Sequence, residues 1–294
     1  MKKFFTSAAA LMTFGFAYSQ ANIDISTQLG NLNEAYINQT GFLNTNVLTQ
    51  DGNRNFATID QVGAANINFA LSEGNRNTID VDQTGILNIN TVEQYGNRNA
   101  ASTEQIGLFN TVTQLQDGNR NSVDAYQLGD SNVAEQYQYG NRNAASTYQL
   151  GASNVSYQVQ VGNRNDANSL QLGISNVAIQ EQYGNRNEAG AYQVGSGNFI
   201  WQTQDGNDND ATHLQIGDGN FADSWQVGNG NSNYGLQLGD GNALTQYQHG
   251  DDNIAIDLQL GNSNFTYVNQ TGSDHFHLGT QIGNSNTLVV TQTN

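Results

Sequence analysis

The chain has 294 residues, including 44 Asn, 31 Gln, 32 Gly, no Pro and no Cys, and carries a net charge of −17. The lack of Cys excludes a disulfide scaffold, a zinc–thiolate site and thiol catalysis, and the acidity argues against nucleic acid as the main partner. Only 36% of the residues are hydrophobic, so the fold must use another source of stability.

The first residues have the pattern of a secretory signal peptide. Lys2 and Lys3 precede an apolar run over residues 4–16, and Ala17 and Ser19 fit the small-residue cleavage site. We therefore expect a signal peptide at residues 1–19 and a repeat domain at residues 20–294. The alternative interpretation is a buried N-terminal helix. No stretch approaches the ~20 apolar residues of a membrane span.

One eleven-residue repeat governs the rest of the chain. From Gln28 to Gln292 every eleventh residue is Gln, except Ser72. In the first 24 of these units a Gly follows two positions later and an Asn five positions later, except His275. The unit Q-x-G-x-x-N-x₅ continues without insertion or deletion, so no domain boundary is expected. The ladder positions nearest the two ends are Gln28, Gly30, Asn33, Gln39, Gly41, Asn44, Gln50, Gly52 and Asn55, and Gln281, Gly283, Asn286 and Gln292.

Alternate units differ, which gives a second period of 22 residues. Units that read G-N-R-N place an Arg at every twenty-second position: Arg54, Arg76, Arg98, Arg120, Arg142, Arg164 and Arg186. Two unequal halves that make one structural repeat are typical of a solenoid.

The repeat favours strands over helices. A Gly in every unit would cost a helix about 1 kcal/mol each, whereas Gly and Asn suit turns. Between turns, Asn33, Ala35 and Ile37 fall on one face, and the residues between them on the other. The sequence predicts an all-β fold: a β-solenoid of about twelve 22-residue coils with two facing parallel sheets, roughly 58 Å long. Each unit should hold a strand of about seven residues and a turn of about four.

The inward positions explain how so polar a chain can fold. Stacked Asn and Gln side chains can form amide ladders that pair buried polar groups, with small Ala residues letting the sheets approach. We expect further apolar burial at Ile79, Val112, Val123, Ile200 and Leu244.

The motif continues to both ends, from Asn22 to Gln292, with no capping segment. Uncapped strand edges are templates for another chain, so we expect end-to-end polymerisation into a cross-β filament. A monomeric ligand-binding adhesin is the alternative.

Q-x-G-x-x-N-x-A-x-x-x-Q resembles the curlin repeat of curli amyloid fibre subunits. The resemblance covers most of the chain and implies a secreted, non-enzymatic β-solenoid subunit in the biofilm fibre at the bacterial cell surface, assembled with a nucleator subunit and an outer-membrane export pore. It leaves open whether the chain is the polymerising subunit or the minor nucleator.

The Arg column has two interpretations. It is either a solvated ladder of turn residues that limits side association, or a contact for a polyanion such as acidic polysaccharide or extracellular DNA. Asp51, Glu73 and Asp117 share turns with three of the Arg residues and could offset their repulsion.

Other features give weaker site hypotheses. Outward aromatic residues suit cross-strand packing, with carbohydrate stacking or surface adhesion as the alternative. His275 and His277 face the same way but lack a third metal ligand, and Asp240, Asp251 and Asp252 lie outside any calcium-binding nonapeptide. We predict no catalytic residue, no cofactor and no metal.

Overall fold

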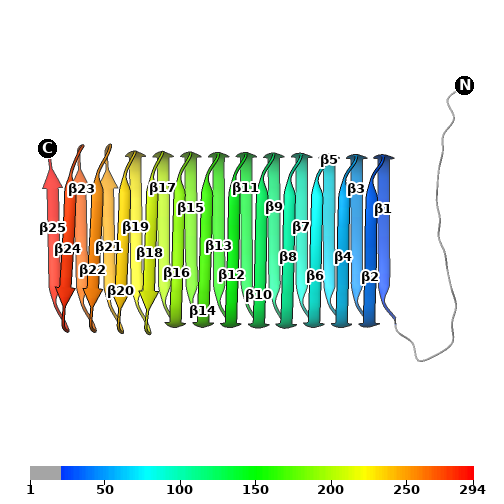
Figure 1. Cartoon of the computed structure of the whole chain (residues 1–294), viewed down its shortest axis with the longest axis horizontal. Coiled ribbons are helices and arrows are strands. Elements are labelled where there is room, and N and C mark those ends of the chain that lie inside the picture. Colours follow the sequence, from blue (N-terminus) through cyan, green and yellow to red (C-terminus); the bar gives the residue numbers. More distant parts are fainter. Residues whose placement is uncertain (1–20) are drawn as a thin grey trace, which may run out of the picture.

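The computed structural model of the chain describes residues 21–294, in which 25 strands alternate with short turns. The 13 odd-numbered strands form one parallel sheet and the 12 even-numbered strands form the other. Figure 1 shows the strands stacked along a straight rod, with the N-terminal and C-terminal strands at opposite ends. The predicted signal peptide lies outside the described residues.

The first sheet contains β1 (Ile23–Asn31), β3 (Thr45–Asn53), β5 (Ile67–Asn75), β7 (Ile89–Asn97), β9 (Thr111–Asn119), β11 (Val133–Asn141), β13 (Val155–Asn163), β15 (Val177–Asn185), β17 (Phe199–Asn207), β19 (Phe221–Asn229), β21 (Ala243–His249), β23 (Phe265–Thr271) and β25 (Thr287–Thr293). The second contains β2 (Glu34–Phe42), β4 (Phe56–Ala64), β6 (Thr78–Ile86), β8 (Ala100–Leu108), β10 (Ser122–Asp130), β12 (Ala144–Ala152), β14 (Asp166–Ile174), β16 (Glu188–Ser196), β18 (Asp210–Ile216), β20 (Ser232–Leu238), β22 (Ile254–Leu260) and β24 (Phe276–Ile282).

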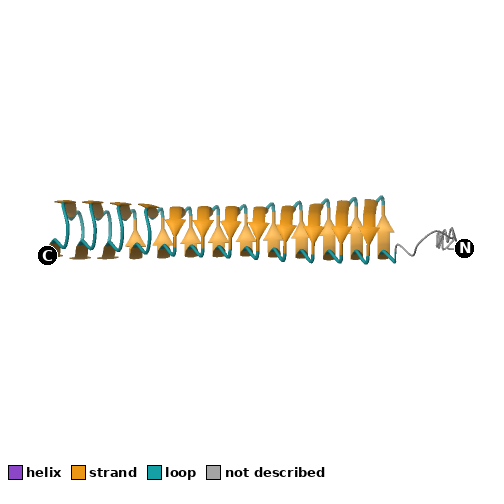
Figure 2. Ribbon diagram, turned by 90° about the horizontal axis from the view of Figure 1, so that it is seen from below, coloured by secondary structure: helices purple, strands orange, loops and turns teal. Residues whose placement is uncertain are grey.

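Each coil consists of two strands and two turns, and each residue pairs with the residue 22 positions later. Gln39 lies opposite Gln61, and Gly41 lies opposite Gly63. Figure 2 shows the two sheets as two layers joined by turns at both edges. The predicted all-β solenoid of about twelve coils with two facing parallel sheets is confirmed.

The strands of the first two thirds of the rod are longer than predicted. They have nine residues up to β17, because pairing continues through the repeat Gly, whereas β25 and its neighbours have seven. In the late turns, side chains replace part of the backbone pairing. Asp218 donates its backbone N–H to Asp240 Oδ1 at 2.9 Å, and Asp240 donates its own to Asn262 Oδ1 at 2.8 Å. Short Asp and Asn side chains can bond the backbone in this way.

Burial alternates along most interior strands, as the parity of the repeat requires. In β16 the buried Gly190 interrupts the alternation. The inward apolar residues expected from the sequence are all buried: Ile79, Val112, Val123, Ile200 and Leu244. The interior changes along the rod. In the early coils, Leu48, Ile59 and Val92 belong to an apolar cluster. In the middle coils, buried Gln side chains occupy inward positions instead, such as Gln136 and Gln158.

Residues 21–294 include no helix that is long and apolar enough to cross a membrane.

Candidate functional site

The repeat Gln residues form hydrogen-bonded columns inside the rod. In the second sheet the column runs unbroken from Gln39 to Gln281, each Nε2 donating to the next Oε1 at 2.7–3.1 Å. The second amide hydrogen crosses between the sheets: Gln39 Nε2 also donates to the backbone oxygen of Ile23 at 3.0 Å. The ladders therefore join successive coils and also join the two sheets.

In the first sheet, Ser72 interrupts the equivalent column. Gln28 donates to Gln50 at 2.7 Å, and the column resumes where Gln94 donates to Gln116 at 2.9 Å. At the break, the buried Ser72 Oγ and Gln94 Oε1 have no hydrogen-bond partner among the described residues. The single departure in the Gln series thus leaves two buried polar atoms unsatisfied.

The repeat Asn residues bond mainly to the backbone. Asn33 Oδ1 accepts the backbone N–H of Asn55 at 3.0 Å, and Asn55 Nδ2 donates to the carbonyl oxygen of Gly74 at 3.0 Å. These bonds close the turns and tie each coil to the next. The sequence predicted that these Asn side chains bond to one another. Such bonds exist beside the backbone bonds, for example from Asn66 Nδ2 to Asn44 Oδ1 at 3.2 Å.

The repeat Gly residues stack where no side chain fits. Gly52 has φ of 121°, and a Cβ there would overlap the carbonyl oxygen of Gly74 in the next coil. At the C-terminal end no coil covers Gly283, whose nearest neighbour would be Asn286 Nδ2 at 3.6 Å. Among the described residues, the C-terminal coil therefore keeps the open space above its Gly that the next coil fills in the interior.

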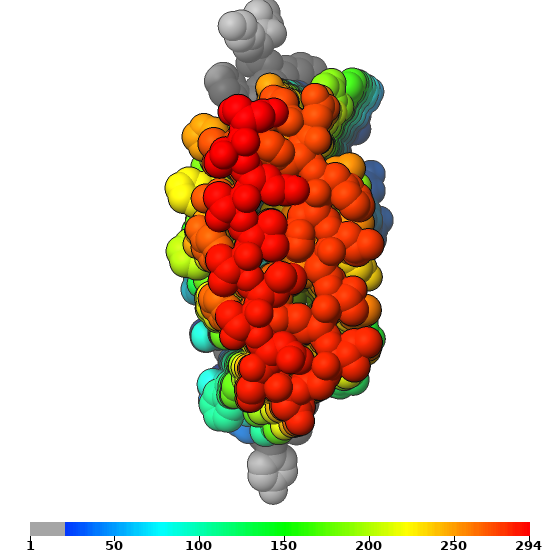
Figure 3. Space-filling model, turned by 90° about the vertical axis from the view of Figure 1, so that its left-hand side faces the viewer, coloured from blue at the N-terminus to red at the C-terminus, as the bar shows by residue number. Residues whose placement is uncertain are grey.

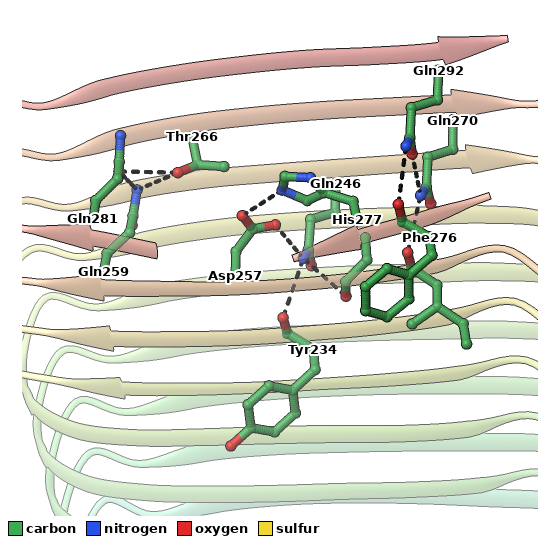
Figure 4. Close-up of polar contacts among 12 residues, drawn as sticks. Tyr234, Gln246, Asp257, Gln259, Thr266, Gln270, Phe276, His277, Gln281 and Gln292 are labelled. Carbon is green, nitrogen blue, oxygen red and sulfur yellow. Dashed lines mark hydrogen bonds and ion pairs between the residues drawn. The ribbon is translucent and has the colours of Figure 1, made fainter. Parts of the chain in front are cut away.

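A buried polar cluster, the His–Asp cluster, lies near the C-terminal end and consists of His213, Gln246, Asp257 and His277. His213 Nε2 lies 3.1 Å from Gln246 Oε1, and its Nδ1 lies 3.0 Å from Gln202 Nε2. Gln246 Nε2 donates to Asp257 Oδ2 at 2.9 Å, and His277 Nε2 lies 3.0 Å from Asp257 Oδ1. Figure 4 shows the part of this cluster in which Asp257 lies between Gln246 and His277.

Burial lowers the pKa of His213 to about 4, although Gln246 and Asp257 act in the opposite direction. The neutral ring fits its partners because Gln202 Nε2 donates to the unprotonated Nδ1, while Nε2–H donates to Gln246. Sequence reasoning missed this cluster. The sequence does place a His and an Asp at inward-facing repeat positions. His213 lies two positions before Gln215, and Asp257 lies two positions before Gln259.

His275 and His277 do not share a ligand. His275 Nε2 lies 3.1 Å from the backbone oxygen of Thr271, whereas His277 contacts Asp257. Within residues 21–294 no group of three or more His, Cys, Asp or Glu side chains is placed to hold a metal ion. Asp240 and Asp251 instead accept backbone N–H groups from the preceding coil.

The strands at both described ends of the rod carry the same repeat residues as the interior strands but are exposed to solvent. β1 is exposed at every residue, and β25 is at most half-buried, whereas inward residues of interior strands are buried. Within residues 21–294 each of these strands has a neighbour on one side only. Figure 3 shows the C-terminal end face, where β24 and β25 lie side by side without a covering element. An unpaired strand edge can accept another strand.

The seven Arg residues line one groove, here called the Arg groove. It has a volume of about 1100 Å³ and runs along one turn edge from Asn31 to Arg186, with a column of Asn beside the Arg column. The Asn side chains bond to one another, as in Asn53 Nδ2 to Asn75 Oδ1 at 2.8 Å. Each Arg has positive φ, near 60°, a conformation that disfavours residues with a Cβ.

Among the described residues, one of these Arg residues has an ion-pair partner. Arg186 Nη2 donates to Asp208 Oδ2 at 2.6 Å, which raises the pKa of Arg186 and lowers that of Asp208. Asp51, Glu73 and Asp117, considered as partners from the sequence, form no ion pair with the Arg column in residues 21–294.

Several outward aromatic residues pack against each other across coils. Tyr126 and Tyr148 stack with ring centroids 4.5 Å apart, and Phe199 and Phe221 stack at 5.4 Å. Trp225 meets Tyr247 edge-on at 6.1 Å. Such pairs stabilise neighbouring strands.

These features define a class of protein: a β-solenoid repeat protein held together by buried amide ladders and open at both described ends. Within the chain, residues 52–85 and 118–146 match the family model described as the Curlin associated repeat. The curlin-repeat resemblance is therefore confirmed over these segments. No curated protein matches the chain significantly.

Proposed function

We propose that the protein is a secreted structural subunit that polymerises end to end into an extracellular, curli-like amyloid fibre. The observation that carries this proposal is the pair of exposed end strands, which keep the ladder residues of the interior. The curlin repeat and the solenoid are structural rather than enzymatic features. In this proposal residues 1–19 are removed on export and residues 20–294 form the subunit.

The cellular setting follows from the curlin resemblance. The fibre lies at the bacterial cell surface and contributes to biofilm matrix and surface adhesion, and its assembly uses a nucleator subunit and an outer-membrane export pore. A role as the minor nucleator of the same fibre is the alternative within this class, and seeding of a second subunit at substoichiometric amounts would favour it.

The test compares two lysine variants of the processed chain. Val290 is an inward residue of β25 and Thr291 is its exposed outward neighbour. In a growing fibre, Lys at position 290 would be buried without a partner, at high cost, whereas Lys at position 291 stays in water. We expect thioflavin-positive fibres with a cross-β spacing of about 4.8 Å from the wild type and Thr291→Lys, but not from Val290→Lys. A wild-type chain that stays monomeric with seeds contradicts polymerisation.

A second function is favoured by the Arg groove. Apart from Lys2 and Lys3, every Lys or Arg of the chain lies in this one column, on a molecule that is otherwise acidic. Adjacent Arg residues belong to neighbouring coils about 4.8 Å apart, near the length of one sugar unit in a linear glycan. We propose that the groove binds an extended acidic polysaccharide with one carboxylate per sugar, through many individually weak contacts.

Two variants with the same change in net charge alter opposite turn edges of the rod. One replaces Arg76, Arg98, Arg120, Arg142 and Arg164 by Gln. The other replaces Ser131, Ser153, Ser175, Ser263 and Ser285, which have the same backbone conformation at the opposite edge, by Asp. Each makes the net charge more negative by five. If only the Arg variant loses retention on a polyuronate resin, the result supports binding of acidic polysaccharide in the Arg groove. Equal loss in both variants, or retention of DNA but not polyuronate, contradicts the proposal.

A further inference from the structure

The two end faces determine how one molecule can follow another, given that the proposed end-to-end assembly occurs. The first sheet has 13 strands and the second has 12, so the described solenoid ends half a coil after its last complete coil. The next strand position after β25 belongs to the second sheet, directly above β24.

Two arrangements of a second copy are possible. If it arrives in the same orientation, its β1 pairs with β25, and its β2 lies two strand positions above β24, which leaves a gap in the second sheet. If it is rotated by a half-turn about the rod axis, its β1 pairs with β24 and its β2 pairs with β25. Both sheets then continue without a gap, and all strands remain parallel.

The inward residues also distinguish the two arrangements. In the rotated copy, the repeat places Asp24 next to His277, Ala35 next to Leu288, and Ile37 next to Val290. Asp24 accepts hydrogen bonds from Asn46 Nδ2 and Ser26 Oγ within its own molecule. In the unrotated copy it would lie against the apolar Leu288 and gain no further polar partner. In both arrangements the repeat Gln residues of the two copies lie next to each other, so the Gln ladders do not distinguish the rotated copy from the unrotated one.

The outward residues agree with the rotated copy. β24 exposes Phe276, Leu278 and Ile282 by 57%, 63% and 73%. The residues of β1 at the same repeat positions are Ile23, Ile25 and Leu29, exposed by 49%, 56% and 53%. In register, these six side chains form three apolar cross-strand pairs. In the unrotated copy these residues of β24 would face the gap, and Ile23 and Leu29 would instead pair with Thr287 and Thr293 of β25.

We propose that successive molecules in the fibre are related by a half-turn about the fibre axis, with β1 of one copy on β24 and its β2 on β25 of the other. The partner surface is the C-terminal face of a second copy of this chain. The contact pairs apolar side chains of β1 and β24 on one outer surface and brings the Asp24 carboxylate to the His277 imidazole, which extends the His–Asp cluster across the junction.

Engineered cysteines test this arrangement, because the chain has no Cys of its own. Thr27, Thr280 and Thr291 are exposed outward residues at the same repeat position on β1, β24 and β25. Paired residues on adjacent strands are close enough for a disulfide. Thr27→Cys with Thr280→Cys should link rotated copies, whereas Thr27→Cys with Thr291→Cys should link unrotated copies. In either variant the two positions lie at opposite ends of one molecule (Figure 1).

Fibres of both variants are oxidised, dissolved in denaturant and separated on a non-reducing gel. We expect a ladder of covalent oligomers from the Thr27/Thr280 variant and mainly monomer from the Thr27/Thr291 variant. The opposite result, or fibres without links in either variant, overturns the half-turn but leaves end-to-end assembly in place. If neither variant nor the wild type forms fibres, polymerisation itself fails.

Discussion

Ser72 shows what a single residue contributes to the ladders. Its Oγ and the Oε1 of Gln94 are buried without partners, and unsatisfied buried polar atoms cost about 1–3 kcal/mol each. A Gln at this position would accept from Gln50 and donate to Gln94, as its neighbours in the column do. We expect Ser72→Gln to stabilise the fold by about 1–2 kcal/mol, measured by thermal unfolding of the monomer.

Ser72→Ala is the matched control, since it removes the unpaired hydroxyl but leaves Gln94 Oε1 unsatisfied. A gain no larger for Ser72→Gln than for Ser72→Ala would show that completing the column is not stabilising.

His213 gives the rod a pH dependence at residue level. Its pKa is about 4 in the folded chain, against an ordinary value of 6.5, so the unfolded state binds the proton more readily between these values. Stability from the neutral ring is therefore present above about pH 6.5 and is lost as the pH falls toward 4. A protonated Nδ1 would also face the Gln202 amide donor.

We expect His213→Gln to reduce this loss. The unfolding temperature of the variant should fall less than that of the wild type between pH 6.5 and pH 4, where the remaining His and carboxyl groups titrate alike in both. Parallel pH profiles would contradict the assignment to His213.

At the scale of elements, the outer face of the second sheet stacks like charges. Asp166 of β14, Glu188 of β16 and Asp210 of β18 are paired in register. Burial, with neighbouring carboxylates in the case of Glu188, raises the pKa of each. A raised carboxyl pKa means that stability is lost as the pH rises through it. We expect Glu188→Gln to stabilise the fold by about 0.5–1 kcal/mol at neutral pH.

That gain should shrink as the pH falls through the raised pKa of Glu188, because the wild-type carboxyl then becomes neutral. Asp130→Asn is the control, since Asp130 pairs with Leu108 and Ala152. An equal gain in both variants would contradict stacking as the cause.

The arrangement of elements followed from the sequence because one period determines both side-chain direction and register. Gln39 must face Gln61 when every residue pairs 22 positions ahead. The nine-residue strands up to β17 did not follow, because the repeat does not reveal that backbone pairing continues through its Gly. The His–Asp cluster was also missed, since it occupies inward positions that the repeat leaves variable and joins residues of both sheets.

At the scale of the whole molecule, charge opposes association. Without residues 1–19 the subunit has seven Arg and 26 acidic residues, a net charge of 7 − 26 = −19. Two approaching rods therefore repel each other over the Debye length, about 30 Å at 0.01 M salt and 8 Å at 0.15 M. We expect fibres to elongate faster as the salt concentration rises from 0.01 M to 0.15 M, at a constant amount of seed and followed by thioflavin fluorescence. A rate that does not change with NaCl would contradict repulsion as the barrier.

The confinement of the Arg column to one edge, residues 54–186, has a consequence for the proposed polymer. With a half-turn at each junction, the cationic strip changes sides with every subunit, about every 60 Å for 25 strands at two per coil. An acidic glycan bound at one strip would reach only alternate subunits, and the subunits between them would present their strips to a different glycan on the far side. Fibres would then act as bifacial cross-linkers, which connect polysaccharide chains into a gel rather than wrapping a single chain along their length.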